Sequence, residues 1–227
     1  MAIFALECEM SDPVRRWLKK EGLAVKDEYV LPWGICDFVG LSFDQERVNK
    51  RLALRQFRPI GPPHRIDLLF QIPDAGTSES ISIRQLRKRS LVLPGDTVER
   101  ELEKLAQNGF VIQHRKDSFQ KLNGWVPLHN RIVAVELKLS RTSKVLGQAA
   151  SHRAFASESY VAMPSKIAER AADTRFAEFH AVGVGILGVT RTACKVLLRP
   201  SASGVPVQST LQAHCVERFW RTRDSSS

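Results

Sequence analysis

Features typical of several protein classes are missing from this 227-residue sequence. No apolar run approaches the length of a membrane-spanning helix, so we expect no membrane partner. The four cysteines lie far apart without a CxxC pair, and the six histidines show no HxxxH spacing. These spacings argue against a structural zinc site or a disulfide framework and favour a reducing, cytoplasmic location. The opening MAIFALECEM has no basic region, so no signal peptide is expected.

Positive charge is the main excess in the composition. The chain has 34 Lys and Arg against 24 Asp and Glu, a net charge of +10. Residues 131–227 hold 14 basic against 7 acidic residues, whereas residues 1–77 hold 11 of each. Such a field attracts polyanions, so DNA is the favoured partner, although solubility alone could also account for the charge. The 43% of hydrophobic residues is ordinary for a globular domain.

Apolar periodicity divides most of the chain into elements of an α/β protein. The segment 10–21 has helical spacing, and Gly22 ends that helix. The stretches 23–31 and 35–43 alternate like strands around a Pro-Trp-Gly turn, which predicts a hairpin. Later patterns predict strands at 131–140, 159–164, 179–190 and 194–200, helices at 143–157 and 165–172, and a loop at 201–210.

The segment 62–128 has a different pattern. Helices are expected at 65–72, 82–90 and 96–109, followed by a basic two-stranded hairpin at 110–128. This order resembles a winged helix-turn-helix, which implies contact with DNA or with another protein. The third helix is acidic, so the basic surface is expected outside it. The candidate nucleic-acid-binding residues are Arg84, Arg87, Lys88, Arg89, Arg115, Lys116 and Lys121, together with Arg141 and Lys144 further along the chain.

Two predicted strands carry charged side chains among apolar ones. In RIVAVELKLS, Glu136 and Lys138 share a face because side chains alternate along a strand. In GICDFVGL, Asp37 shares its face with three apolar residues. A buried carboxylate needs a partner, a proton or a cation, so adjacent strands would place Asp37 and Glu136 around one ion. Oxygen ligands favour Mg²⁺, with Mn²⁺ as a substitute, and Lys138 would hold a phosphate or position water.

Together these motifs resemble the PD-(D/E)XK nuclease superfamily, which has the restriction-endonuclease-like fold. Within it, the sequence is similar to a group of bacterial PD-(D/E)XK phosphodiesterases of unassigned function. The matching features are Glu7 before Pro13-Val14, Glu28, Gly34-x-Cys36-Asp37, Val135-Glu136-Leu137-Lys138, Gln148 and the strand 159–164. They cover 1–43 and 131–200, two parts that the group joins more directly.

The resemblance implies a fold and a division of the chain. The fold is an α/β restriction-endonuclease-like core, in which a mixed central sheet is flanked by helices. That core would occupy 1–46 and 131–227, with an inserted winged helix-turn-helix at 62–128.

The resemblance also implies roles for particular side chains. Asp37 and Glu136 would bind the metal, and Lys138 would stabilise developing charge or activate water. Gln148 would position the site from the following helix, unless it is an ordinary surface residue. Glu28 is either a further ligand or a solvated side chain, and Glu7 is either a ligand or an ordinary acid before the first helix. The implied activity is Mg²⁺-dependent endonucleolytic hydrolysis of DNA.

Several alternatives stay open at this point. The core could be non-catalytic, with the winged helix acting in a nucleic-acid-binding or regulatory subunit. The same chemistry fits RNA or branched junctions, because backbone contacts carry no sequence information. A homodimer would suit cutting of both strands. The literal GxGxxG at 183–188 sits among apolar residues, so it indicates a glycine-containing strand and no nucleotide cofactor is expected.

Overall fold

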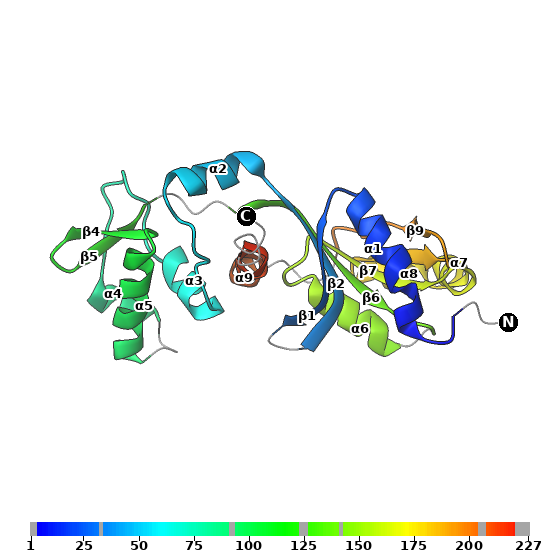
Figure 1. The fold of residues 1–227 in the computed structure, drawn as a ribbon. Helices are drawn as coiled ribbons and strands as arrows, with labels where there is room; N and C mark the ends of the chain where they lie inside the picture. The colour runs from blue at the N-terminus through cyan, green and yellow to red at the C-terminus, as the bar shows by residue number, and fades with distance from the viewer. Residues whose placement is uncertain are drawn as a thin grey trace. The chain divides into compact units, whose positions relative to one another are not determined.

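The computed structural model describes residues 4–31, 34–90, 94–122, 127–140, 143–203 and 208–220. The chain forms an α/β protein with two compact units (Figure 1). The sheet unit comprises Met1–Phe43 with His129–Gln208, and the insert unit comprises Asp44–Leu128 with Ser209–Ser227.

A mixed sheet of six strands forms the centre of the sheet unit, in the order β1-β2-β6-β7-β8-β9. Its strands are β1 (Ala24–Leu31), β2 (Gly34–Phe43), β6 (His129–Leu137), β7 (Glu158–Pro164), β8 (Val184–Val189) and β9 (Cys194–Leu198). The first three form an antiparallel meander, β6 to β8 run parallel, and β9 returns antiparallel to β8. A crossover must join parallel neighbours, and helix α6 supplies it between β6 and β7.

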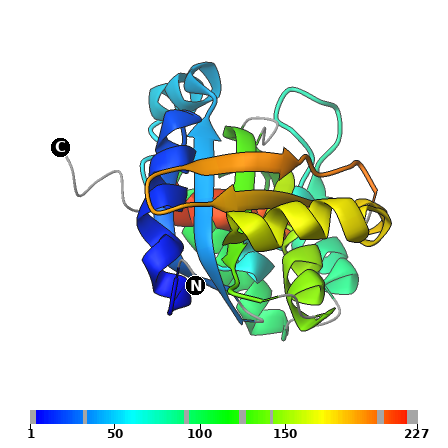
Figure 2. The same cartoon turned by 90° about the vertical axis from the view of Figure 1, so that its right-hand side faces the viewer.

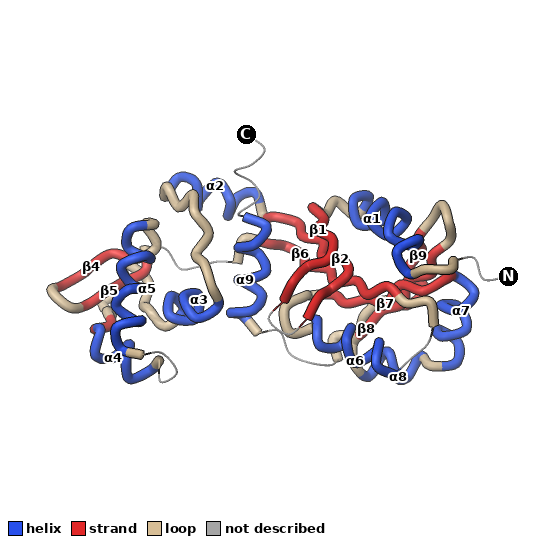
Figure 3. Tube along the Cα trace, turned by 60° about the horizontal axis from the view of Figure 1, so that its bottom comes forward, coloured by secondary structure: helices blue, strands red, loops and turns tan. Residues whose placement is uncertain are grey.

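Helices cover both faces of this sheet (Figure 3). On one face lie the 3₁₀ helix η1 (Glu7–Met10) and α1 (Ser11–Lys20), which bury Met10, Val14 and Leu18 at helical spacing. On the other lie α6 (Ser143–His152), α7 (Ser165–Thr174) and α8 (Phe176–Ala181). Figure 2 shows α1 (blue) beside β2 and α7 (yellow) beside β8. Each apolar face of the sheet is therefore closed by helices.

The insert unit is built from helices and a small antiparallel sheet of order β3-β5-β4. Its elements are α2 (Gln45–Ala53), α3 (Pro63–Phe70), β3 (Ile81–Ser82), α4 (Ile83–Arg89), α5 (Gly95–Gln107), β4 (Val111–Arg115), β5 (Ser118–Lys121) and α9 (Ser209–Trp220). Leu69 of α3, Leu86 of α4, Leu102 of α5 and Phe110 share one buried cluster. Ser82 caps α4 through a reciprocal pair of bonds with Gln85, an arrangement that satisfies two backbone donors.

The elements differ from the sequence pattern in several places, and two of them end early, because β6 ends at Leu137 rather than at 140 and α6 ends at His152 rather than at 157. The pattern predicts a strand from 179 to 190, but residues 176–181 form α8 and β8 begins at Val184. Phe179 is buried from the helix, and Gly183 makes the turn at a φ of +70°. The pattern also predicts a loop through 210, but α9 begins at Ser209 and belongs to the insert unit. The expected core boundaries of 46 and 131–227 therefore differ from the observed division.

The glycines at 183–188 lie in and before a strand, as predicted. A Cβ atom at Gly185 would lie 2.5 Å from the ring of Tyr160, so the neighbouring strand leaves no room for a side chain. Within the described part of the chain, none of the helices combines the length and apolarity needed to cross a bilayer.

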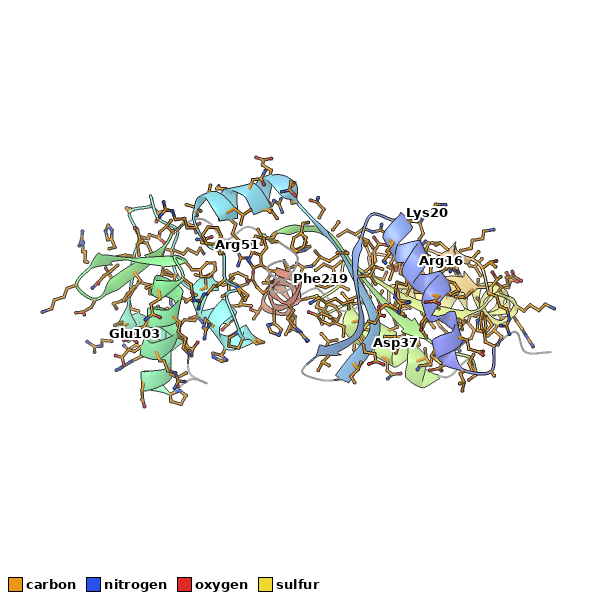
Figure 4. All side chains as sticks on the ribbon, viewed as in Figure 1. Arg16, Lys20, Asp37, Arg51, Glu103 and Phe219 are labelled. Atoms are coloured by element: carbon orange, nitrogen blue, oxygen red, sulfur yellow. The ribbon has the colours of Figure 1, made fainter. Side chains whose placement is uncertain are left out.

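A buried ion pair joins the two ends of the insert unit. Arg51 of α2 and Glu217 of α9 are 1% and 2% exposed and form two bonds of 2.6 and 3.0 Å. The remaining groups are also satisfied. Arg51 donates to the carbonyls of Gln56 and Arg58, and Glu217 accepts from the Ile60 N–H at 2.7 Å. Figure 4 labels Arg51 beside Phe219 of α9.

Removal of one member of this pair should destabilise the insert unit strongly. Glu217→Ala leaves a buried guanidinium without its counter-charge, which costs about 3–5 kcal/mol in the free energy of unfolding. Urea denaturation measures the loss. The exposed pair Arg87–Glu99 of the same unit provides the control, because Glu99→Ala should cost less than about 1 kcal/mol. Equal losses in the two variants would contradict the importance assigned to the buried pair.

Candidate active site

Strand β2 places Asp37 where its pairing with β6 ends. Phe38 and Val135 are the last registered pair at that end. One residue further, the Asp37 carboxylate accepts a hydrogen bond of 2.7 Å from the N–H of Leu137. A side chain thus satisfies a backbone donor at the end of the ladder. Figure 4 labels Asp37 on this strand.

The surroundings of Asp37 raise its pKa to about 6, against an ordinary value of 3.8. Burial is the largest cause, and the neighbouring Glu136 carboxylate raises the pKa further. The hydrogen bond from Leu137 and the charge of Lys138 act in the opposite direction without cancelling the rise. Two acids therefore lie together with too little positive charge between them.

Glu136 is the more deeply buried of the two acids, at 2% exposure. Its Oε1 atom lies 2.6 Å from Nε2 of His152, the last residue of α6, which is itself 4% exposed. His152 follows Val145 and Ala149 on the buried stripe of α6, at positions i, i+4 and i+7. A crossover helix thus supplies the direct partner of the strand carboxylate.

A cavity of about 490 Å³ opens beside Asp37. The described residues that line it are Glu7, Cys8, Ser11, Arg15, Asp27, Glu28, Asp37, Phe38 and Leu137. Four of them are acids and one is an arginine, which makes ion pairs with Asp12 and Asp27. Three of the acids, Glu7, Glu28 and Asp37, were candidates from the sequence. Glu136 does not line the cavity. It lies in the interior, next to Asp37 and to its partner His152.

Backbone geometry marks Glu28 as unusual. Its φ is +45°, in the left-handed region, although it lies inside strand β1. A residue other than glycine is destabilised there by about 1–2 kcal/mol. Such conformations persist where the surrounding structure enforces them, and they gather at functional sites. Glu28, the residue with this strained backbone, lines the cavity together with Asp37.

Lys138 lies just beyond the end of β6 and is half-buried. Its Nζ atom lies 3.1 Å from Oε2 of Glu7, which comes from the 3₁₀ helix before α1. Glu7 Oε1 also accepts a longer bond of 3.4 Å from the N–H of Leu139. The ion pair with Lys138 therefore holds Glu7 at the site. Glu7 is a candidate metal ligand there rather than a remote surface acid.

Gln148 takes a less direct position. It is exposed on α6, and its backbone carbonyl accepts a bond from Ser151. Because it precedes His152 by four residues, it lies on the same face of the helix, one turn nearer its start. Within the described residues it has no side-chain bond to Asp37, Glu136 or Lys138.

The candidate nucleic-acid-binding residues divide into three groups. Six are exposed in the insert unit, namely Arg84, Arg87, Lys88 and Arg89 on α4 and Arg115 and Lys116 on the hairpin. Lys121 differs, because only 13% of its side chain is exposed and it lies 3.4 Å from Asp74. Its ion pair with Asp74 and its place at the end of the hairpin strand β5 give Lys121 a structural role. Arg141 and the side chain of Lys144 lie outside the described residues.

Arg15, Cys36 and His152 are among the residues near the site that were not candidates. Arg15 lines the cavity, and Cys36 and His152 approach Glu136. The position of His152 had a signal, because the apolar spacing that predicts α6 places residue 152 on its buried face. Cys36 had no such signal in the sequence. Side chains alternate along a strand, so the pattern places Cys36 and Asp37 on opposite faces of β2.

The carboxylates fit a hard divalent cation. Mg²⁺ is commonly held by one or two carboxylates, with water and phosphate oxygens completing its shell. Asp37 offers one such carboxylate at an open cavity, and Glu7 and Glu28 offer others on its wall. Burial first, and the Glu136 carboxylate second, raise the pKa of Asp37, and a bound cation would lower it again.

Comparison of the chain with protein-family models, with curated proteins and with solved structures found no match. Function must therefore be inferred from the geometry of the site.

Relief of the clustered acids should be measurable as thermal stability. The folded-state pKa of Asp37, about 6, lies above the ordinary 3.8, so ionisation opposes folding at higher pH. Asp37→Asn retains an oxygen to accept from Leu137 but cannot ionise. We expect it to raise the Tm in EDTA at pH 8, with the gain disappearing as the pH falls below about 4.

The control for this variant is Asp173→Asn, at an exposed position of α7 in the same unit. It should leave the Tm unchanged across the same pH range. A lower Tm for Asp37→Asn at pH 8 would show that the carboxylate stabilises the fold as an ion-pair partner.

Proposed function

We propose that this protein is a metal-dependent nuclease that hydrolyses DNA phosphodiester bonds with an activated water. The observation that carries the proposal is the position of Asp37. Its carboxylate lies against Glu136, on the wall of a cavity that also presents Glu7 and Glu28. Lys138 is paired with Glu7 at the same place.

The arrangement of the sheet unit supports the resemblance to the restriction-endonuclease-like fold. Helix α1, the meander β1-β2-β6, the crossover α6 and the parallel strand β7 follow one another as that fold implies. The insert unit enters between β2 and β6, where that resemblance expects a direct connection.

In this proposal the charged side chains divide the chemistry among them. When bound, Mg²⁺ or Mn²⁺ would supply polarisation of the phosphate and a lower pKa for an attacking water. Asp37 would hold the cation, with Glu136 behind it and Glu7 or Glu28 completing the carboxylate set. Lys138 would offset the negative charge that grows on the phosphate oxygens as the water oxygen attacks and the ester oxygen leaves.

Arg15 is placed to assist substrate binding. Its guanidinium lines the cavity, and 32% of its side chain is exposed. Asp12 and Asp27 hold it in position from two sides. A planar guanidinium donates to two phosphate oxygens at once, so Arg15 would orient the scissile phosphate over Asp37.

The insert unit would bind nucleic acid or a partner protein. Its order α3-β3-α4-α5-β4-β5 and its sheet order β3-β5-β4 support the winged helix-turn-helix interpretation. The third helix is acidic on its surface, and Arg87 of α4 is paired with Glu99 of α5. Arg84, Arg87 and Lys88 line a cavity of about 800 Å³ together with the acids Glu99 and Asp117, so α4 presents three basic side chains to it.

Cleavage assays test the catalytic part of the proposal. Plasmid, linear, branched and single-stranded DNA, and RNA, are incubated with the protein in Mg²⁺ and in EDTA. Asp37→Ala and Lys138→Ala should each lower the Mg²⁺-dependent rate by at least about 100-fold while leaving a folded protein. Lys166→Ala, at an exposed lysine of α7, is the matched control and should retain full activity. Full activity in Asp37→Ala or Lys138→Ala would remove the proposed site.

Binding assays test the insert unit separately from the chemistry. The double variant Arg84→Glu and Lys88→Glu reverses two exposed charges four residues apart on α4. If both contact phosphates of B-DNA, the slope of log affinity against log salt should fall in magnitude by about 2. Lys166→Glu with Arg170→Glu makes the same change at the same spacing on α7 and should alter affinity less. An equal loss in both double variants would show that α4 has no special role.

A further inference from the structure

Three metal-binding side chains from three elements meet in the interior of the sheet unit. Cys36 comes from β2, Glu136 from β6 and His152 from α6, and all three are buried. One ligand atom of each lies within 4.8 Å of the other two. The spacing of these residues in the sequence could not reveal the cluster, because the sheet and its crossover helix bring them together.

Hydrogen bonding leaves this cluster incomplete. Nε2 of His152 has Glu136 as its partner, whereas Nδ1 is buried without a bond to any described residue. A buried polar atom without a partner destabilises the folded state. The two nitrogens of the imidazole point to opposite sides of the ring, so an ion held by Nε2 beside Glu136 would leave Nδ1 unmet, and the case for a metal rests on the approach of the three ligand atoms.

The donor types differ from those of the neighbouring acids. A thiolate and an imidazole are soft or borderline ligands that select zinc-class ions, whereas Mg²⁺ prefers oxygen. One carboxylate added to a cysteine and a histidine is a common mixture around Zn²⁺. The cluster is therefore chemically distinct from the cavity lined by Glu7, Glu28 and Asp37.

We propose that Cys36, Glu136 and His152 form a second metal site, which binds a zinc-class ion at a position adjoining Asp37. Three protein ligands leave the fourth position of a tetrahedral ion for water. The site shares Glu136 with the proposed nuclease centre, but it rests on the position of the three side chains and not on that activity.

Only small movements separate the observed arrangement from a metal-bound one. Ligands at about 2.0–2.3 Å from one tetrahedral ion lie roughly 3.3–3.8 Å apart. The 2.6 Å pair of His152 and Glu136 must therefore open by about 1 Å, while the thiol closes on them. The Cys36 thiol now donates to the carbonyl of Phe38 at 3.2 Å. On binding, its S–H bond breaks, the sulfur bonds to the ion, and the proton leaves to solvent.

Cobalt and zinc titrations test the site without any nucleic acid. Co²⁺ added to the metal-free protein should produce a near-ultraviolet thiolate-to-cobalt absorption band at one ion per chain, and Zn²⁺ should abolish it. Cys36→Ser and His152→Gln should each weaken Zn²⁺ binding by at least about tenfold. Asp37→Asn, which alters the proposed nuclease centre, should retain the band. The Tm of each variant in EDTA shows whether it is folded.

A further variant of the protein keeps the test valid if Cys36→Ser or His152→Gln fails to fold. The triple variant Cys8→Ser, Cys194→Ala and Cys215→Ala leaves Cys36 as the sole thiol. It should give the same cobalt band as the wild type. No band in the wild type, or a band lost in the triple variant, overturns the proposal whatever the cleavage assays show. A normal band with no cleavage would instead overturn the nuclease alone.

Discussion

The hydrogen bond from the Leu137 N–H to the Asp37 carboxylate is the interaction on which the candidate site depends. It forms where the β2–β6 ladder ends, and it replaces a backbone acceptor with a charged side chain. Every other feature of the site follows from that position. Asp37 is held against Glu136, the cavity opens in front of it, and Lys138 follows at the end of the same strand. This bond opposes the separation of two acids that repel one another.

Two buried glutamates in this chain show how a structural acid differs from a candidate functional one. Glu217 has a bidentate arginine, itself stacked on the Trp220 ring, and a backbone donor, so its charge is fully compensated. Glu136 has a histidine, whose charge depends on protonation, and a second acid beside it. Folding alone favours the first arrangement. The second, together with the left-handed backbone of Glu28, is a cost that binding of a cation would offset.

The secondary structure around the site could be predicted from the sequence, but the full set of side chains that meet there could not. Alternation predicted the bounds of β1, β2 and β6 within three residues, and it drew attention to Asp37, Glu136 and Lys138. It missed the approach of Cys36 and His152 to Glu136, because that approach depends on how the strands and the crossover helix pack. It also missed α9, whose apolar face is matched to the insert unit rather than to its neighbours in sequence. Lys121 was a candidate nucleic-acid-binding residue. Its ion pair is with Asp74, 47 residues earlier in the chain, so the sequence pattern could not reveal it.

Glu136 is the residue at which the two proposed metal preferences meet. One of its neighbours is an oxygen ligand, Asp37, at an open cavity, and the others are a sulfur and a nitrogen in the interior. A single carboxylate cannot serve a hard ion on one side and a borderline ion on the other without sharing its oxygens between them. If the ions bind together, Glu136 would be shared between them while Asp37 holds the outer one. If they compete, an ion in the inner site would take Glu136 away from its place beside Asp37. In either case the buried partner His152, and not the exposed Gln148, decides how Glu136 is oriented.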